Sequence, residues 1–363
     1  MKKRLFSLLV LILLLFVTAC GGGGQQNTAP QTPEPASENT EQTNDSSETK
    51  PAIKIGITQI VEHPSLDAAR EGFIQALLDN GYTEGENLEI DLQFAQGDAG
   101  INATIAQQFA AGDYDAILAI ATPSAQAVVQ QVRDAGKDTP IFFTAITDPV
   151  GAGLIESFEN PGANVTGTSD THPQAIENTM KAIKALFPEA KKVGMIYNAG
   201  EDNSVANVEQ ANKVMAEIGL ESVEKSATDA NGVTSAAQSL VGEVDVIYIP
   251  KDNLVVSNLE AVGIVAQEHK IPLFVGEGDS VERAGGGFLG YGFKYFDLGY
   301  QTGEMALKVL EEGVNPGDIP AERPSTLGLY VNYKSAKEQG IENIEELIQG
   351  LPEELRQNMV EFH

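Results

Sequence analysis

Short apolar runs rich in Val and Ile alternate with helical patterns from residue 53 onward, and this alternation constrains the fold more than any other feature. The first expected strands are residues 53–58, 88–94, 114–120 and 140–145, and the helices between them are residues 66–78, 101–111 and 124–135. Strands that are separated by one helix each pair in parallel through right-handed crossovers. This part of the chain is therefore expected to form a doubly wound α/β unit.

The pattern then starts again, which predicts an α/β fold of two doubly wound, parallel-sheet (Rossmann-like) lobes with a ligand cleft between them. Further strands are expected at residues 192–197, 221–226, 244–249, 271–275, 288–293 and 326–331, and helices at residues 174–186, 205–218, 233–240, 254–269 and 297–310. The chain is expected to cross between lobes near Val165 and Phe288. The expected division is residues 53–165 plus 288–323 for the N-terminal lobe, 166–287 plus 324–350 for the C-terminal lobe, and 351–363 for a tail.

The first residues are typical of an export signal. Residues 1–4 are a basic start, residues 5–17 are almost entirely apolar, and the run ends at Cys20, the only cysteine. The apolar run is too short for a stable membrane span, so residues 1–19 are expected to be a signal peptide. Residues 17–20, Val-Thr-Ala-Cys, resemble a bacterial lipobox. This resemblance implies lipidation of Cys20 and an anchor on the extracytoplasmic face of the cell membrane; the alternative is an ordinary secretory signal with a chance cysteine.

Residues 20–52 follow the proposed anchor with polar residues and glycines, and none of their apolar residues after Cys20 is larger than alanine or proline. Such a segment cannot bury enough surface to offset its chain entropy, so a disordered linker is expected. The formal net charge of the whole chain is −29, which disfavours nucleic acid and anionic lipid surfaces as partners. The four histidines are scattered, so no metal site is expected.

Sequence motifs for catalysis and for cofactors give little. No glycine-rich phosphate-binding fingerprint follows the first strand, and no nucleophile-elbow motif occurs, so no cofactor and no enzymatic activity are expected. Glu62 and His63 are adjacent and would suit acid–base chemistry, but ligand or structural contacts are the preferred interpretation. A two-lobed racemase would need two facing thiols, and the single cysteine removes that option.

Ligands of open parallel sheets bind beyond the carboxyl ends of the strands, so the polar residues directly after the strands form the candidate site. Thr122 and Ser124 open a helix whose free amides and positive dipole end suit a carboxylate. Asp148 in one lobe and Asp252 with Asn253 in the other are expected to bind a ligand ammonium. Two alternatives stay open, namely Thr122 as a simple helix cap and Asp148 as a turn residue.

Several segments resemble the ABC-transporter substrate-binding family that includes tryptophan, tyrosine and phenylalanine binders. They are residues 57–67, 119–126, 143–152, 164–170, 193–198 with Gly200 and Glu201, 245–248 with Asp252 and Asn253, and 290–295 with Gly299. The resemblance implies a type I periplasmic-binding-protein architecture and an L-amino acid as the ligand. It also implies an ABC permease with its ATPase as partners of a monomeric receptor.

The resemblance carries over to individual cleft residues as well. Those it implies are Thr122, Ser124, Asp148, Asn198, Asp252 and Asn253, with Gln59 and Glu62 beside them. Thr147, which follows the fourth expected strand, and the aromatic residues Tyr197 and Phe293 complete the expected ligand-binding set. An aromatic ligand would need rings to stack on, and Tyr197, Tyr291, Phe293 and Tyr295 are the candidates, although each is equally suited to a core.

The leading hypothesis is a lipid-anchored receptor of an ABC importer that closes its two lobes around an aromatic L-amino acid, Trp, Tyr or Phe. One alternative is a sensory lipoprotein that binds the same ligand and reports to a signalling partner. Others are a receptor of the same fold for a different small solute and an extracellular enzyme, which ligand turnover would reveal.

Overall fold

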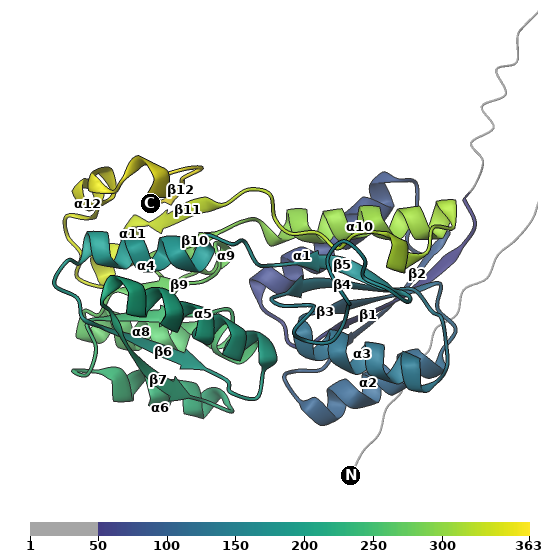
Figure 1. The fold of residues 1–363 in the computed structure, drawn as a ribbon, viewed down its shortest axis with the longest axis horizontal. Coiled ribbons are helices and arrows are strands. Elements are labelled where there is room, and N and C mark those ends of the chain that lie inside the picture. The colour runs from purple at the N-terminus through teal and green to yellow at the C-terminus, as the bar shows by residue number, and fades with distance from the viewer. Residues whose placement is uncertain (1–49) are drawn as a thin grey trace, which may run out of the picture. The chain divides into compact units, whose positions relative to one another are not determined.

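The structure is a computed structural model that describes residues 50–363, and these residues form one compact unit. The expected signal peptide, the lipidation site at Cys20 and nearly all of the expected linker lie outside the described residues. Two separate sheets organise the described part of the chain (Figure 1). We call the lobe around the first sheet the N-lobe and the lobe around the second sheet the C-lobe.

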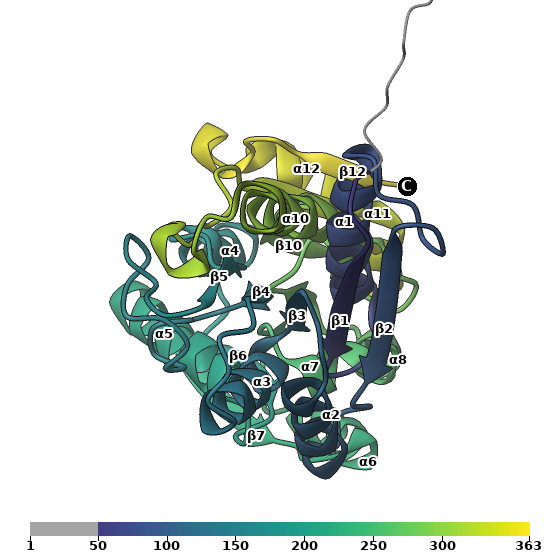
Figure 2. The same cartoon turned by 90° about the vertical axis from the view of Figure 1, so that its right-hand side faces the viewer.

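The N-lobe has a five-stranded sheet in which all strands are parallel, in the order β2-β1-β3-β4-β5. The strands are β1 (Ile53–Gln59), β2 (Leu88–Phe94), β3 (Ala116–Ile120), β4 (Ile141–Ile146) and β5 (Val165–Ser169). Four helices cover the sheet: α1 (Pro64–Asp79), α2 (Ala99–Ala111), α3 (Thr122–Asp134) and α10 (Tyr295–Glu312). Helices α1 and α10 lie on one face, and α2 and α3 lie on the other (Figure 2).

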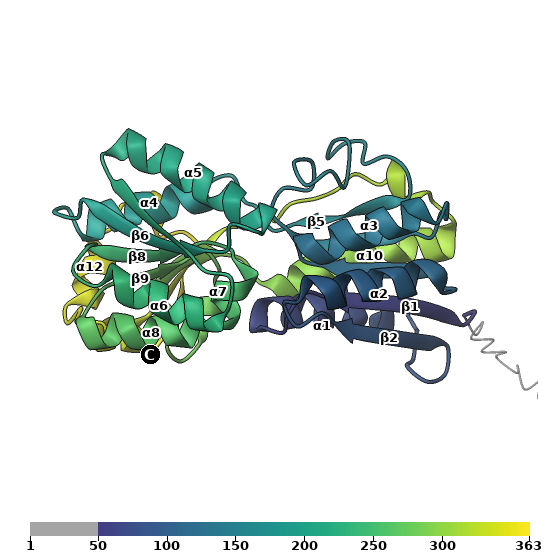
Figure 3. The ribbon, with the colours of Figure 1, turned by 90° about the horizontal axis from the view of Figure 1, so that it is seen from below.

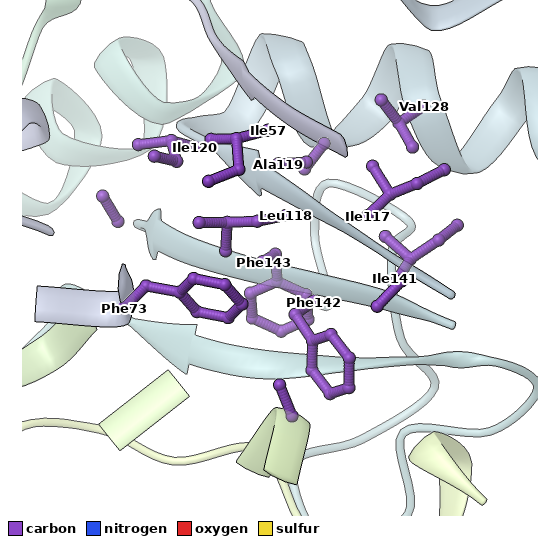
Figure 4. Close-up of a cluster of buried hydrophobic side chains, with 14 of the residues drawn as sticks. Ile57, Phe73, Ile117, Leu118, Ala119, Ile120, Val128, Ile141, Phe142 and Phe143 are labelled. Carbon is purple, nitrogen blue, oxygen red and sulfur yellow. The ribbon is translucent and has the colours of Figure 1, made fainter. Parts of the chain in front are cut away.

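Coverage on both faces explains why the central strands are continuous apolar runs. All residues of β3 and of β4 are buried, and Ile117, Leu118 and Phe143 have no exposed surface (Figure 4). Parallel sheets with helices on both faces require this composition, because neither side of a strand faces water. The core therefore fixes the position of the carboxyl ends of β3 and β4, which lead into Thr122 and Asp148.

Helix α10 comes late in the chain but packs beside α1 in the N-lobe (Figure 1). Glycines make the close approach of the two helices possible. A Cβ atom at Gly299 of α10 would collide with the carbonyl oxygen of Ala69, and one at Gly72 of α1 would collide with the carbonyl oxygen of Phe296. The packing of α10 against α1 thus holds the segment that follows the second passage between the lobes in the N-lobe.

The C-lobe has a seven-stranded sheet in the order β12-β11-β10-β9-β8-β6-β7. Its strands are β6 (Lys192–Tyr197), β7 (Glu221–Ser226), β8 (Val246–Ile249), β9 (Leu273–Val275), β10 (Leu289–Gly292), β11 (Gly328–Asn332) and β12 (Val360–Phe362). All neighbours pair in parallel except β10 and β11, which pair antiparallel. The expectation of parallel pairing is thus met except at this one pair, because the helix between its strands, α10, packs in the N-lobe and not against the C-lobe sheet.

Helices cover both faces of the C-lobe sheet. Helices α4 and α5 lie on one face and α6 and α8 on the other (Figure 3). The helical elements after β5, with α10 already given, are α4 (Ala175–Leu186), α5 (Asp202–Ile218), α6 (Ala230–Leu240), α7 (Asn253–Ser257), α8 (Leu259–His269), α9 (Asp279–Glu282), α11 (Tyr333–Glu338), α12 (Ile344–Gly350), and the 3₁₀ turns η1 (Pro316–Asp318) and η2 (Glu353–Leu355).

The strand pairing shows that the chain passes between the lobes a few residues later than expected at two places. Strand β5 belongs to the N-lobe sheet, so the first crossing follows Ser169 rather than Val165. Strand β10 belongs to the C-lobe sheet, so the second crossing follows Gly292 rather than preceding Phe288. The expected tail at residues 351–363 is also wrong as a description of structure, because β12 within it adds a strand beside β11.

Candidate functional site

A cleft between the lobes is bordered by the segments that follow β3 and β4 in the N-lobe and by the start of α5 in the C-lobe. Its cavity volume is about 190 Å³. The lining residues are Thr122, Asp148, Gly151 and Ala152 from the N-lobe and Asp202, Asn203, Val205, Ala206 and Glu209 from the C-lobe. Helix α5 begins at Asp202, which lines this cleft, and the side-chain amide of Gln126 in α3 donates to Asp202 Oδ2 at 2.7 Å across it.

The N-lobe wall of the cleft is built at the start of α3. The preceding residue, Ala121, has φ 73°, a left-handed conformation that is strained for a residue other than glycine. The strained turn places Thr122 at the first position of the helix, where its hydroxyl is buried and has no hydrogen-bond partner among residues 50–363. Ser124, also buried, donates to Asn102 Oδ1 at 3.3 Å. The Thr122 hydroxyl is therefore free for a ligand, whereas the Ser124 hydroxyl has a partner within its own lobe.

Two further expected site residues follow β4. Asp148 is exposed at the cleft, and its Oδ1 accepts a hydrogen bond from the backbone amide of Gly151 at 2.9 Å, so it stabilises its own turn. Thr147 is half-buried, and its hydroxyl donates to Asp170 Oδ1 at 3.2 Å. The same hydroxyl accepts a bond from Asn207 Nδ2 of α5 at 3.3 Å. Thr147 therefore joins the two lobes beside the cleft.

The C-lobe wall contains a cluster of carboxyl and amide groups after β6 and β8. Asp252 caps α7 by accepting a bond from the amide of Val255 at 2.7 Å, and its second oxygen accepts one from the amide of Asn198 at 2.6 Å. Glu201 accepts bonds from the side-chain amides of Asn198, Asn203 and Asn253. The structure thus brings three expected site residues, Asn198, Asp252 and Asn253, together around Glu201.

Burial controls the electrostatics of this cluster. It raises the pKa of the Glu201 carboxyl, and the neighbouring Asp252 raises it further. Burial also raises the pKa of Asp252, against the opposing effect of the bonds from Asn198 and Val255. Within residues 50–363 no Lys or Arg forms an ion pair with either carboxylate. A positively charged ligand group would be stabilised at such a site.

A second cluster lies where the chain crosses between the lobes. Asp170 follows β5, and its Oδ2 accepts a hydrogen bond from Tyr295 OH, at the start of α10, at 2.9 Å. Lys251 from the end of β8 lies 3.7 Å from Asp170 Oδ1, donates to the Asp170 carbonyl, and sits 4.8 Å from the centre of the Phe293 ring. The cluster joins both crossing segments to the C-lobe, and it includes Phe293, an expected ligand residue.

A third contact between the lobes lies at the start of α1. Ser65 Oγ donates to Glu277 Oε2 at 2.7 Å, and both residues are buried. Burial raises the pKa of Glu277 to about 7, although the bond from Ser65 and the positive charge of Lys251 oppose the shift. His63 is buried beside this contact, and burial together with the charge of Arg283 lowers its pKa to about 4.

Of the expected site residues, Thr122 and Asp148 line the cavity. Three others take no part either in the lining or in the clusters described above. Gln59 is fully buried within the N-lobe, where it donates to Asp67 at 2.9 Å and accepts from Arg70 at 2.7 Å. Glu62 is exposed. Tyr197 is half-buried at the end of β6, and its hydroxyl donates to Glu224 on the edge strand β7 at 3.1 Å. Their assignment as ligand residues remains a prediction.

The structure adds site residues that the sequence-based set did not include. Asp170, Glu201, Asn203, Lys251 and Glu277 are all buried between or beside the lobes. Each of them follows a strand, which is the signal that could have found them. Among residues 50–363 no group of three His, Cys, Asp or Glu side chains is placed to hold a metal ion. No helix in this same range is long and apolar enough to cross a bilayer.

Comparisons with known proteins agree with this two-lobed architecture. The family model described as ABC transporter substrate binding protein matches residues 54–354. A curated protein of Clostridioides difficile (strain R20291), named Tyrosine-binding protein, is 45% identical over 294 residues, which cover 81% of this chain and 83% of that one.

Two solved structures are similar over the same region. The ABC domain of a Streptococcus pneumonia protein in complex with L-Trp has a TM-score of 0.76 at 33% identity, covering 86% of this chain and 100% of that one. The ligand-free, open structure of a Clostridium difficile substrate-binding protein with adhesive properties has a TM-score of 0.61 at 41% identity, with the same coverages. The chain belongs to the ABC transporter substrate-binding protein family, which consists of binding proteins and not of enzymes.

Proposed function

We propose that this protein is an extracytoplasmic, lipid-anchored receptor that binds an aromatic L-amino acid and delivers it to an ABC permease and its ATPase. Tyrosine and tryptophan are the preferred candidates for the ligand. The observation that carries the ligand assignment is the 45% identity to a tyrosine-binding protein across 81% of the chain. The L-Trp complex of the 33% identical structure supports the same class of ligand.

The chemistry of the cleft supports a zwitterionic ligand. On the N-lobe side, the free Thr122 hydroxyl stands at the positive end of the α3 dipole, where a carboxylate is favoured. On the C-lobe side, the buried carboxylates Glu201 and Asp252 have no cationic partner within the described residues. An amino acid carries one group for each wall, so its binding would draw the lobes together.

The arrangement of the lobes supports capture by closure. The TM-score is higher for the L-Trp complex than for the open, ligand-free structure, although the sequence identity to the open structure is higher. Hydrogen bonds from Ser65 to Glu277 and from Gln126 to Asp202 join the lobes on different sides of the cleft. Opening the lobes would break both bonds, and a ligand bound to both walls would oppose that.

The specificity is tested by isothermal titration calorimetry of the purified protein with tyrosine, tryptophan and phenylalanine, with leucine, glutamate and lysine as controls. We expect saturable binding of at least one aromatic amino acid and at least tenfold weaker binding of the controls, about 1.4 kcal/mol. Binding of a control amino acid alone, or of none of the aromatic ones, would refute the proposed ligand class.

The anchor is tested separately in cells. Metabolic labelling with a radioactive fatty acid should mark the wild-type protein and not the Cys20→Ala variant. The variant should also leave the membrane fraction. Equal labelling of both proteins would place the lipid elsewhere and would reject Cys20 as the anchor.

A further inference from the structure

Glu201 is a buried carboxylate whose hydrogen-bond partners are all neutral. It is 9% exposed. Asn198 Nδ2 donates to Oε1 at 3.3 Å, and the side-chain amides of Asn203 and Asn253 donate to Oε2. A buried carboxylate without a counter-charge is costly, and amide donors offset only part of that cost. No ion pair within residues 50–363 offsets this cost at Glu201.

The two other acidic candidates for a ligand ammonium are engaged by the backbone. Both oxygens of Asp252 accept bonds from backbone amides, those of Asn198 and Val255. Asp148 is exposed, and one of its oxygens is held by the amide of Gly151. Glu201 differs from both because side chains alone hold it, and side-chain amides can shift to admit a ligand.

The side chain of Asn203 connects Glu201 with the lining of the cleft. Asn203, which donates to Glu201 Oε2 at 3.4 Å, lines the cleft, is 7% exposed and carries an Oδ1 acceptor with no hydrogen-bond partner. Thr122, which is 1% exposed, lines the same cleft from the N-lobe, also with a hydroxyl that lacks a partner. Two residues that line one cavity from opposite walls therefore each carry a buried oxygen that has no hydrogen-bond partner among residues 50–363.

The charges around the cavity favour a cation there. Its lining contains Asp148, Asp202 and Glu209, and the part of the chain that the structure describes contributes no Lys or Arg to it. The buried Lys251 near this region pairs with Asp170 in the cluster where the chain crosses between the lobes. An ammonium that donates to Asn203 Oδ1 would lie beside Glu201 and would neutralise it.

We propose that Glu201, with Asn203 Oδ1, binds the primary ammonium of the ligand, and that Asp252 and Asp148 instead hold the loops that shape the site. The proposal rests on the proposed amino acid specificity. Glu201 supplies the charge, Asn203 supplies the first acceptor, and the opposite wall at Thr122 is left for the carboxylate.

The test compares tyrosine with its analogue that lacks the amine, 3-(4-hydroxyphenyl)propanoate, on the wild-type protein and on Glu201→Gln, Glu201→Asp and Glu217→Gln. We expect Glu201→Gln to weaken tyrosine binding by roughly 10- to 100-fold and to leave the affinity for the analogue almost unchanged. Glu201→Asp should lie between the wild type and Glu201→Gln. Glu217→Gln removes an exposed acid near the end of α5, outside the cavity lining, and should change neither affinity.

Thermal unfolding of each variant shows whether its fold is intact, and Glu201→Gln should unfold no earlier than the wild type because it removes a buried charge. Unchanged tyrosine affinity in Glu201→Gln, or an equal loss for tyrosine and for the analogue, would overturn the assignment. If the wild type binds a different primary amine, the proposed specificity for tyrosine is wrong. The same variants, titrated with that amine and with its deamino analogue, then test whether Glu201 binds the ammonium group. If no primary amine binds, the ammonium site and the proposed function both fail.

Discussion

Thr122 carries one of the hydroxyls within residues 50–363 that are buried and unpartnered, and it lines the interlobe cleft. A buried hydroxyl without a partner costs about 1–3 kcal/mol relative to its hydrated state. We predict that Thr122→Val leaves the free energy of unfolding unchanged or raises it, and weakens ligand binding by roughly tenfold. Calorimetric titration together with urea unfolding measures both effects.

Thr166 provides the matched control. It is also fully buried, but its hydroxyl donates to the carbonyl oxygen of Ile319 at 2.7 Å. Thr166→Val should therefore lower the free energy of unfolding by about 1–3 kcal/mol, because the carbonyl loses its donor, and should leave affinity unchanged. A loss of stability in Thr122→Val equal to that in Thr166→Val would mean that the Thr122 hydroxyl has a partner in the free protein.

Asp252 illustrates a different role at the residue scale. Its carboxylate caps α7 and also accepts a bond from the amide of Asn198, in a position that is 1% exposed. We predict that Asp252→Ala lowers the free energy of unfolding by about 2–4 kcal/mol, since the helix cap and a second buried bond are lost together. Asp229→Ala removes the exposed cap of α6 and should cost only about 1 kcal/mol. Equal losses, measured by urea unfolding, would contradict the structural role of Asp252.

At the scale of elements, the contact between α1 and α10 depends on glycines. A Cβ atom at Gly299 would strike the backbone of α1 at Ala69, which cannot move without shifting the whole helix. We predict that Gly299→Ala lowers the free energy of unfolding by about 1–3 kcal/mol, although alanine is the better helix former. Gly350→Ala, at the end of α12 with open space around it, should be neutral or slightly stabilising. Urea unfolding of both variants measures these effects. A Gly299→Ala variant as stable as the wild type would mean that α1 and α10 lie further apart.

Sequence periodicity predicted the elements best where an apolar strand precedes a long helix. The first strand, expected at residues 53–58, is Ile53–Gln59. Strands β5 and β12 were missed, because Val165–Ser169 has a central glycine among polar residues and Val360–Phe362 has only three residues. The expected helix at residues 254–269 is broken at Asn258, whose side-chain amide donates to the carbonyl of Leu254 and competes with the helical backbone.

Local sequence patterns also predicted only part of the candidate site. The sequence predicted Thr122, Asn198 and Asp252 as site residues because the residues after parallel strands gather at one edge of a sheet. It did not predict which residues meet across the lobes, because that depends on how two separately built sheets face each other. The bond from Ser65 to Glu277 spans 212 positions and has no local pattern.

At the scale of the molecule, buried polar contacts hold the two lobes together, and two of the groups involved lose charge when they are buried. Glu277 accepts a bond from Ser65 of α1 and one from Ser280 of α9, and it faces Lys251, Asp170 and Asp279. His63 precedes α1 and faces Arg283, Asp67 and Asn253. Both are 5% exposed or less, and neither has an ion-pair partner within the described residues.

Their effects on stability have opposite signs with pH. The pKa of Glu277 is raised from 4.5 to about 7, so its contribution to stability is complete below pH 4.5 and is lost as the pH rises to about 7. The pKa of His63 is lowered from 6.5 to about 4, so its contribution is present above pH 6.5 and is lost as the pH falls to about 4. Between these limits one group gains a proton on folding while the other loses one, and the two contributions nearly cancel.

We therefore predict opposite pH dependences for the two single variants, measured by urea unfolding of Glu277→Gln and His63→Gln at pH 5 and pH 7.5 against the wild type. The stability of Glu277→Gln relative to the wild type should rise by roughly 2 kcal/mol from pH 5 to pH 7.5, because the wild type alone buries an acid that must then ionise. The relative stability of His63→Gln should fall by a similar amount, because only the wild type gains from a histidine that is neutral at the higher pH. The double variant should follow the wild type. Parallel slopes for the single variants would show that the two groups do not lose their charges together at the contact between the lobes.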